Sequence, residues 1–185
     1  MSAGHGHGGD HHGPGNKGIA LLIALLALVL AFSETLGKSA QTAALAHHLE
    51  ASNLWAFFQA KTVRQTTLRT AAELAEATST SEASKKQVAK WRETAQRYQS
   101  EPETNEGRDQ LMARAKAQEE KQKKAMASYH HYETASAAVQ IAIVMASASI
   151  ITGIALLAWI AGGLGILGII FSVIGFFFPT AVHLF

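Results

Sequence analysis

The chain has 185 residues, a formal net charge of +2 and a hydrophobic fraction of 48%, and it contains no cysteine. This length is enough for one domain, and the absence of cysteine excludes disulfides and thiolate chemistry. The apolar residues gather in two regions, one near the start and one at the end, and the middle is polar. The division predicts an all-α membrane protein.

Residues 1–18 form a tail rich in Gly and His, "MSAGHGHGGDHHGPGNKG". The tail has no hydrophobic periodicity, so no apolar burial would offset the entropy of ordering it. We therefore expect it to be disordered. Four of its histidines could collect Zn, Ni or Cu weakly, or have no role: His5, His7, His11 and His12.

Three apolar segments are close to the ~20 residues that a helix needs to cross a ~30 Å hydrocarbon layer. We expect transmembrane helices at residues 19–36, 137–161 and 164–185. The Gly162-Gly163 link is short enough only for a tight turn, which predicts an antiparallel hairpin of the last two spans. The first span lacks a cationic leader and a convincing cleavage site, so it is expected to be a permanent anchor and not a signal peptide.

The polar middle, residues 37–136, is rich in Ala, Gln, Glu, Lys and Thr, which is typical of long helices. One break is expected at "TSTSEAS", where Ser79 and Glu82 fit a capping box. Another is expected where Pro102 and Gly107 interrupt the chain. The expected helices are at about 37–78, 82–99 and 108–136. They would form a helical hairpin, a coiled-coil-like stalk, between the first and second spans.

Two of these helices carry stripes at spacings of three and four. The short helix has Val88, Trp91, Ala95 and Tyr98. The return helix has a heptad row that alternates apolar and polar residues: Leu111, Ala115, Gln118, Gln122, Ala125, Tyr129 and Tyr132. Such a row gives a thin core for two helices. The thin core favours a homo-oligomer, in which several copies share it.

The cationic residues indicate an orientation. Of the 16 Lys and Arg, 15 lie between Lys38 and Lys124, and cationic segments tend to stay in the cytoplasm. The middle and the C-terminus are therefore expected inside, and the N-terminus outside. The middle mixes 15 basic with 12 acidic residues, which is typical of a solvated helical surface and not of a nucleic-acid site.

Each span also carries small residues at spacings of three and four, which allow membrane helices to approach closely. In the first span they are Ala20, Ala24, Ala27 and Ala31, and in the second Ala142, Ala146, Ser149 and Gly153. In the third they are Ala161, Gly165, Gly168, Ser172 and Gly175. Chance is an alternative explanation for the alanine stripe. Three stripes together favour tight bundling, within or between copies.

The stretches "EASNLWAFFQAKTVRQ" (50–65) and "YHHYETASAAVQIAIVMASASIIT" (129–152) resemble an uncharacterised bacterial membrane family, domain of unknown function 4337. In that family's pattern a Trp precedes two tyrosines and Gln-Ala-Lys, and here Phe57 and Phe58 replace the tyrosines. The resemblance covers nearly the whole chain from Ile19 onward. It implies an integral protein of the bacterial envelope with one span, a helical middle and two further spans. It implies no activity and no site residues.

Two clusters could carry metal chemistry, one on each arm of the expected hairpin. They are His47, His48 and Glu50, and His130, His131 and Glu133. A His and a Glu three residues apart share a helical face, and imidazoles with carboxylates suit Zn or another transition metal. Adjacent histidines point about 100° apart on a helix. The alternative, solvated residues at the bilayer edge, therefore stays open.

Glu34 is the only acid in a predicted span, and an ionisable group inside a membrane is a functional hypothesis by default. Lys38 could pair with it near the headgroups, which would give it a structural role at an interface. The alternative is an ion or proton pathway in an oligomer. Trp55, Phe57 and Phe58 are expected to bury against the return arm or a neighbouring copy, and a partner-docking patch is the alternative.

No phosphate loop, no nucleophile with a base and no convergent acid pair is present, so we expect no enzyme activity. The sequence favours a self-associating scaffold or accessory subunit of the bacterial inner membrane. Its expected partners are the lipid bilayer, further copies and a larger membrane complex, with no nucleic acid. An oligomeric ion channel is one alternative. A metal-binding or metal-sensing protein is the other, and apart from that no cofactor is expected.

Overall fold

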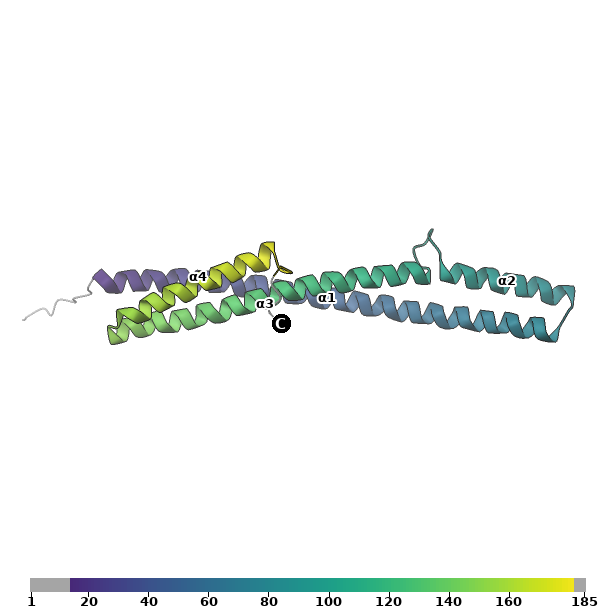
Figure 1. Cartoon of the computed structure of the whole chain (residues 1–185), viewed down its shortest axis with the longest axis horizontal. Coiled ribbons are helices and arrows are strands. Elements are labelled where there is room, and N and C mark those ends of the chain that lie inside the picture. Colours follow the sequence, from purple (N-terminus) through teal and green to yellow (C-terminus); the bar gives the residue numbers. More distant parts are fainter. Residues whose placement is uncertain (1–13, 182–185) are drawn as a thin grey trace, which may run out of the picture. The chain divides into compact units, whose positions relative to one another are not determined.

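The structure is a computed structural model, and it describes residues 14–181 (Figure 1). These residues form four helices: α1 (Pro14–Thr78), α2 (Glu82–Gln99), α3 (Arg108–Thr152) and α4 (Ala155–Phe177). No strand occurs in this part of the chain. The expected all-α class is therefore confirmed for residues 14–181. The tail histidines and the last four residues of the expected third span lie outside the described residues.

Helix α1 begins earlier than expected. Residues 14–18 were expected to belong to a disordered tail, whereas the structure places them in the first turns of α1. Pro14 is the first helical residue, a position that suits proline because its fixed φ matches the helix and its missing N–H would have no partner there. The start of α1 is thus compatible with its sequence despite two glycines in the first turns.

Three of the helices, α1 from Lys17, α3 and α4, are long and apolar enough to cross a membrane, as judged from length and composition. The expectation of a turn at Gly162-Gly163 was wrong. Helix α3 ends at Thr152, and Gly153 adopts the left-handed conformation at φ 73°. Glycine is the usual residue at this position after a helix because it has no Cβ to strain. The Ser149 hydroxyl donates to the Ile154 carbonyl oxygen at 3.0 Å and supports the turn.

The expected bounds 137–161 and 164–185 are corrected accordingly. Helix α4 runs from Ala155 to Phe177 through Gly162 and Gly163. A Cβ added to either glycine would meet no atom within 4 Å, so neither is required for a turn or for a close approach. Inside an apolar segment the backbone groups of these glycines are best satisfied within a continuous helix.

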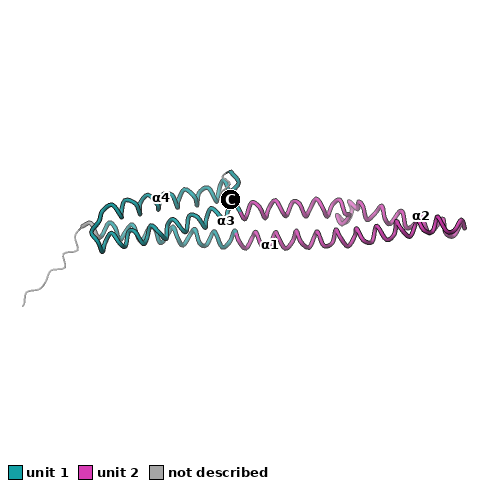
Figure 2. The backbone as a smooth tube through the Cα atoms, turned by 60° about the horizontal axis from the view of Figure 1, so that its bottom comes forward, with its two compact units in different colours: residues 1–40, 127–185 teal, residues 41–126 magenta. Residues whose placement is uncertain are grey.

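The chain divides into two compact units (Figure 2). The first, here called the apolar unit, comprises residues 1–40 and 127–185, of which 14–40 and 127–181 are described. The second, the polar unit, comprises residues 41–126. Helices α1 and α3 contribute to both units, α2 only to the polar unit and α4 only to the apolar unit.

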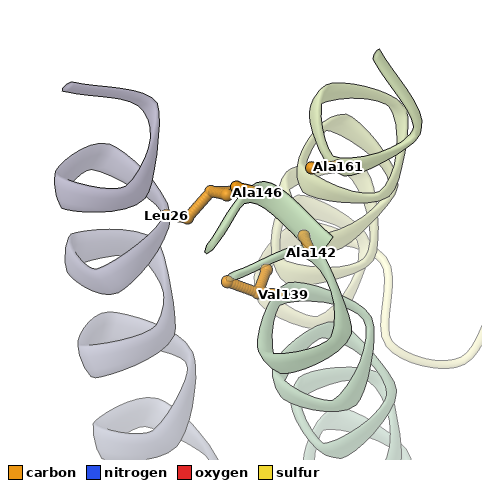
Figure 3. Close-up of a cluster of buried hydrophobic side chains, with 5 residues drawn as sticks. All are labelled: Leu26, Val139, Ala142, Ala146 and Ala161. Atoms are coloured by element: carbon orange, nitrogen blue, oxygen red, sulfur yellow. The ribbon is translucent and has the colours of Figure 1, made fainter. Parts of the chain in front are cut away.

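The core of the apolar unit lies between α1, α3 and α4. Its buried residues are Leu26, Val139, Ala142, Ala146 and Ala161, and Leu26 extends from α1 toward Ala146 of α3 (Figure 3). Half-buried Leu22, Ile23 and Val29 of α1 pack around this cluster. Three of the five core residues are alanines, so the helices approach closely, as is typical of membrane bundles.

The polar unit is built on rows of residues spaced by three and four. On α1 the buried residues are Ala44, Ala51, Leu54, Lys61, Gln65 and Ala72. The rows expected on the other two helices face inward as well: Val88 and Ala95 of α2 are buried, and so are Leu111 and Ala115 of α3. Heptad spacing keeps one face of a helix against its neighbours. This face includes two large polar side chains, Lys61 and Gln65.

The helix ends in the polar unit coincide with those expected at residues 78, 82, 99 and 108. The capping residue of α2 differs from the expected one. Ser81, and not Ser79, is the N-cap, and its hydroxyl accepts a hydrogen bond from the Ser84 N–H at 3.2 Å. A side chain in the N-cap position can reach the free N–H groups of the first turn, which Ser79 is too far away to do.

Candidate functional site

A group of buried and half-buried polar side chains joins the three helices of the polar unit. We call it the Lys61 cluster, and its members are Lys61, Gln65, Gln99, Glu101 and Arg108. Lys61 is only 5% exposed and Gln65 only 2%. Lysine is almost never fully buried unless it is paired. The burial of Lys61 therefore depends on the groups that pair with it.

Lys61 lies between a carboxylate and two aromatic rings. Its Nζ donates a hydrogen bond to Glu101 Oε2 at 3.2 Å, and it lies 5.4 Å from the ring centroids of Phe57 and Tyr98. Aromatic faces attract a cation electrostatically. The hydrogen bond from Lys61 holds the pKa of Glu101 below its usual value of 4.5, because it stabilises the ionised carboxylate.

Gln65 and Arg108 complete the cluster. The Gln65 amide Nε2 donates to the Ala95 carbonyl oxygen at 2.9 Å and to Gln99 Oε1 at 3.1 Å. Arg108 Nη1 donates to Gln65 Oε1 and, at 3.0 Å, to Gln99 Oε1. The Arg108 guanidinium also lies 4.9 Å from the Phe58 ring centroid. These contacts tie α1 to the end of α2 and the start of α3.

The loop that carries Glu101 is closed by a glycine. A Cβ added to Gly107 would lie 2.4 Å from the Glu101 backbone nitrogen and 2.8 Å from the Ser100 Cα. Both contacts are to backbone atoms and closer than real Cβ contacts, so a larger residue would displace the loop. Gly107 thus allows the approach that places Glu101 beside Lys61.

The lowered pKa of Glu101 predicts a pH dependence of stability. A carboxyl group with a depressed folded-state pKa contributes stability above its unfolded value, near 4.5, and loses it as the pH falls through the folded value. At pH values below about 4.5 we expect the unfolding temperature of the chain to decrease. In the Glu101→Gln variant, which cannot be protonated at this position, we expect a smaller decrease. Thermal unfolding followed by circular dichroism between pH 7 and pH 3 measures both. An identical decline in the variant would contradict the assignment.

The apolar unit holds a few polar contacts between helices. The hydroxyl oxygens of Ser33 on α1 and Ser172 on α4 lie 2.8 Å apart, and Gln140 Nε2 on α3 donates to Glu34 Oε1 at 3.2 Å. His131 is 1% exposed, and its Nε2 donates to the Pro179 carbonyl oxygen at 3.1 Å. Each contact joins two segments that are distant in sequence. Their geometry gives them a role in holding the helices together.

Residues 15–178 match the sequence pattern of a family described as Domain of unknown function (DUF4337). The chain belongs to the DUF4337 family. The match spans all four helices except the first residue of α1, and it confirms the resemblance seen in the sequence. Neither a curated protein nor a solved structure matches this DUF4337 chain.

The two histidine clusters of this DUF4337 chain fall in different units, with His47 and His48 in the polar unit and His130 and His131 in the apolar unit. His47 Nδ1 lies 2.8 Å from Gln118 Oε1, and His130 Nδ1 lies 3.4 Å from Glu133 Oε2. Within residues 14–181 no three His, Asp or Glu side chains come together in a way that could hold a metal ion. Metal binding by the tail histidines stays a prediction.

The aromatic residues divide between two environments. Trp55 Nε1 donates to Glu119 Oε1 of α3 at 2.8 Å, and Trp55 and Phe58 pack on the buried cluster of Leu54, Leu111 and Ala115. Phe57 lies beside Lys61 and stays 36% exposed. Trp55 and Phe58 therefore lie against α3 within the chain. Phe57 instead lies beside Lys61.

The three stripes of small residues also have different surroundings. The α3 residues Ala142, Ala146 and Ser149 are buried, although Gly153 is exposed. On α4, Ala161, Gly165, Gly168 and Gly175 are buried, and Ser172 bonds to Ser33. On α1, in contrast, all four alanines of the stripe are exposed, as are Glu34 and Lys38. The buried residues of α1 in the described part of this unit are Leu26, Ser33 and Gly37.

The Lys61 cluster was missed in the sequence analysis, although a signal was present. The positions 54, 58, 61, 65, 68 and 72 continue one heptad row on α1, and all of them are buried or half-buried. Polar residues within such a row indicate a buried polar contact with another helix. Extending the row through Lys61 and Gln65 would have identified two members of the cluster, though not their partners.

Proposed function

We propose that this chain is a self-associating structural or accessory subunit of a bacterial inner membrane. In this proposal α1, α3 and α4 cross the bilayer, and the polar unit is a helical-hairpin stalk on the cytoplasmic side. The supporting observations are the three helices apolar enough to span a membrane and the close packing of α4 on its neighbours through Gly165, Gly168 and Gly175.

One observation carries the proposal: α1 and α3 each belong to both units and remain helical from the apolar into the polar surroundings. Two helices therefore connect the two units without an intervening loop. An anchored rigid helical unit is suited to placing or spacing other components near a membrane. In the polar unit the side chains of the Lys61 cluster mostly contact one another. Polar groups that satisfy one another in this way rigidify a fold, which suits a structural role.

The charge distribution supports the orientation. Fifteen of the 16 Lys and Arg lie in the middle of the sequence, and Gly153 and Ile154, the link between α3 and α4, are uncharged. Cationic segments tend to remain in the cytoplasm, so residues 37–136 and the C-terminus would lie inside and the N-terminus outside. Trp159 of α4, near this link, is 81% exposed, which suits a tryptophan at the outer headgroups.

Light scattering on the detergent-solubilised full chain tests self-association. We expect a protein mass of two or more copies in a mild detergent, because the polar unit exposes large apolar side chains such as Leu45, Leu49 and Val63. A monomer at all concentrations would contradict the proposal. Recording in planar bilayers tests the channel alternative, and currents altered by Glu34→Gln would favour the channel over the scaffold.

A further inference from the structure

Helix α2 contributes little to the core of the polar unit. Of its 18 residues seven are charged, and two others, Val88 and Ala95, are buried. Most of the stability of a helix within a protein comes from the packing of one apolar face. Because α2 buries one medium-sized and one small side chain, its position on α1 depends largely on contacts other than apolar packing.

The first part of α3 has a stronger attachment to α1. Leu111 and Ala115 of α3 are fully buried, and they pack with Leu54 and with the rings of Trp55 and Phe58. No residue of α2 belongs to this buried cluster. Burial of apolar surface is the dominant favourable contribution to folding. The α1–α3 pair therefore has a core of its own, to which α2 does not contribute.

The N-terminal half of α2 meets the end of α1 through exposed groups. Arg92 Nη2 lies 2.6 Å from Glu76 Oε2, and the two side chains are 59% and 45% exposed. An open hollow of about 240 Å³ lies beside this ion pair, and its lining includes Ser79, Ser84 and Val88. An exposed ion pair contributes little to stability. This half of α2 is therefore loosely attached to α1.

The C-terminal end of α2 is held by Gln65 of the Lys61 cluster. The Gln65 amide Nε2 donates to the Ala95 carbonyl oxygen at 2.9 Å and to Gln99 Oε1 at 3.1 Å. The site is dry, since Gln65 and Ala95 are each 2% exposed. Without the Gln65 amide these acceptors would lose a partner while α2 is in place, whereas water would pair with them once α2 has moved away. Gln65 therefore favours the closed position of α2.

We propose that α2 detaches from α1 as a unit while α1 and α3 remain paired, and that the hydrogen bonds of Gln65 keep α2 closed. Segments with few buried apolar contacts open at a lower free energy than the core of the same protein. Helix α2 is such a segment, and the α1–α3 pair with its cluster around Leu111 is such a core. The opening needs neither a membrane nor a second copy. It therefore goes beyond the proposed function, and its failure would leave that function intact.

The hinge of this opening lies near Ser100, where α2 ends in extended backbone. The loop after it is bonded to α3, because the Glu101 N–H donates to Gln110 Oε1 at 3.3 Å. Gln110 Nε2 in turn donates to Ser100 Oγ at 3.0 Å. These bonds allow the loop to stay on α3 when α2 moves. Gln99, the last residue of α2, donates to Asp109 Oδ1 at 2.8 Å in an exposed contact, which the opening would break.

Thiol labelling of single cysteines in the detergent-solubilised full chain tests the opening, because the natural chain has no cysteine. The variants are Ala95→Cys on α2 and Ala115→Cys on α3, at alanines that are 2% and 0% exposed. A buried thiol reacts when its segment opens, so we expect Ala95→Cys to be labelled at least roughly tenfold faster than Ala115→Cys. Adding Gln65→Ala should accelerate the labelling of Ala95→Cys by a further factor of about ten and leave Ala115→Cys within about twofold. Adding Gln59→Ala, at an exposed glutamine of the same helix, should change neither rate.

Three results would overturn the proposal. Equal labelling rates for the two cysteines would show that α2 does not open separately from α3. Equal acceleration of both by Gln65→Ala would show a general loosening of the polar unit, and no acceleration of either would show that Gln65 does not control the opening. Hydrogen exchange gives a second measurement on the unsubstituted chain. We expect the amides of residues 86–99 to exchange faster than those of residues 112–126, and equal protection of the two segments would contradict the proposal.

Discussion

Replacing Gly168 with leucine should destabilise the apolar unit by about 1–3 kcal/mol relative to the same replacement at Gly163. A Cβ at Gly168 would lie 2.4 Å from Val139 Cγ2 and 3.2 Å from the Ala135 carbonyl oxygen. Valine is stiff about χ1, and a helix carbonyl has little freedom to move. The substituted α4 would therefore have to move away from α3, and the core around Val139 would lose contacts.

Gly163 provides a matched control because it lies on the same helix and is exposed, with no atom within 4 Å of an added Cβ. Both variants gain the same helix propensity, since glycine is the poorer helix former in each case. Their difference isolates the packing effect. Unfolding of the purified chain in a titration of denaturing detergent, followed by circular dichroism, measures it. Equal stability of the two variants would show that α4 does not pack on α3 through Gly168.

The variant Gln65→Ala should destabilise the polar unit by about 2–4 kcal/mol, the sum of a small cavity and an unmet polar group. Gln65 is 2% exposed and joins α1 to α2 through Ala95 and Gln99 and to α3 through Arg108. Without the Gln65 side chain, Arg108 Nη1 keeps one of its two hydrogen bonds within the cluster, the one to Gln99. Arg108 cannot lose its charge in response, so the cost falls on the folded state.

Gln59→Ala is the control for this variant, because Gln59 is an exposed glutamine on the same helix. We expect it to change the unfolding free energy by less than about 0.5 kcal/mol, as surface substitutions commonly do. Thermal unfolding of both variants in the same detergent gives the comparison. If both variants unfold like the unsubstituted chain, the Lys61 cluster does not stabilise the polar unit.

The helix ends of the polar unit could be predicted because their signals are local. Pro102 and Gly107 interrupt one segment, and serines near residue 80 provide a cap for the next helix. The α3–α4 turn was misplaced for the opposite reason. The apolar segment around it has no charge, so Gly153 and the Gly162-Gly163 pair were equally plausible from local sequence. Only the packing of α4 distinguishes them, and packing depends on residues far away in the sequence.

The candidate sites, like the α3–α4 turn, depend on contacts between residues that are far apart in the sequence. The Lys61 cluster joins residues up to 47 positions apart, from Lys61 to Arg108, so no short motif reveals it. Each polar member, taken alone, is typical of a solvated surface. The small-residue stripes could be listed from spacing, but spacing does not say which stripe is used within the chain. The structure distinguishes them, because α4 buries its stripe and α1 exposes its alanines.

The claim on which the account depends is that the apolar part of α1 lies in a membrane and the polar part outside it. The chain has no cysteine, so single cysteines introduced along α1 report their own exposure to a membrane-impermeant thiol reagent. We expect no labelling at residues 21, 25 and 28 in intact membranes, and rapid labelling at residues 46, 53 and 64 once the cytoplasmic side is opened. Labelling of the first group, or labelling of the second from the outer side of intact cells, would contradict the account.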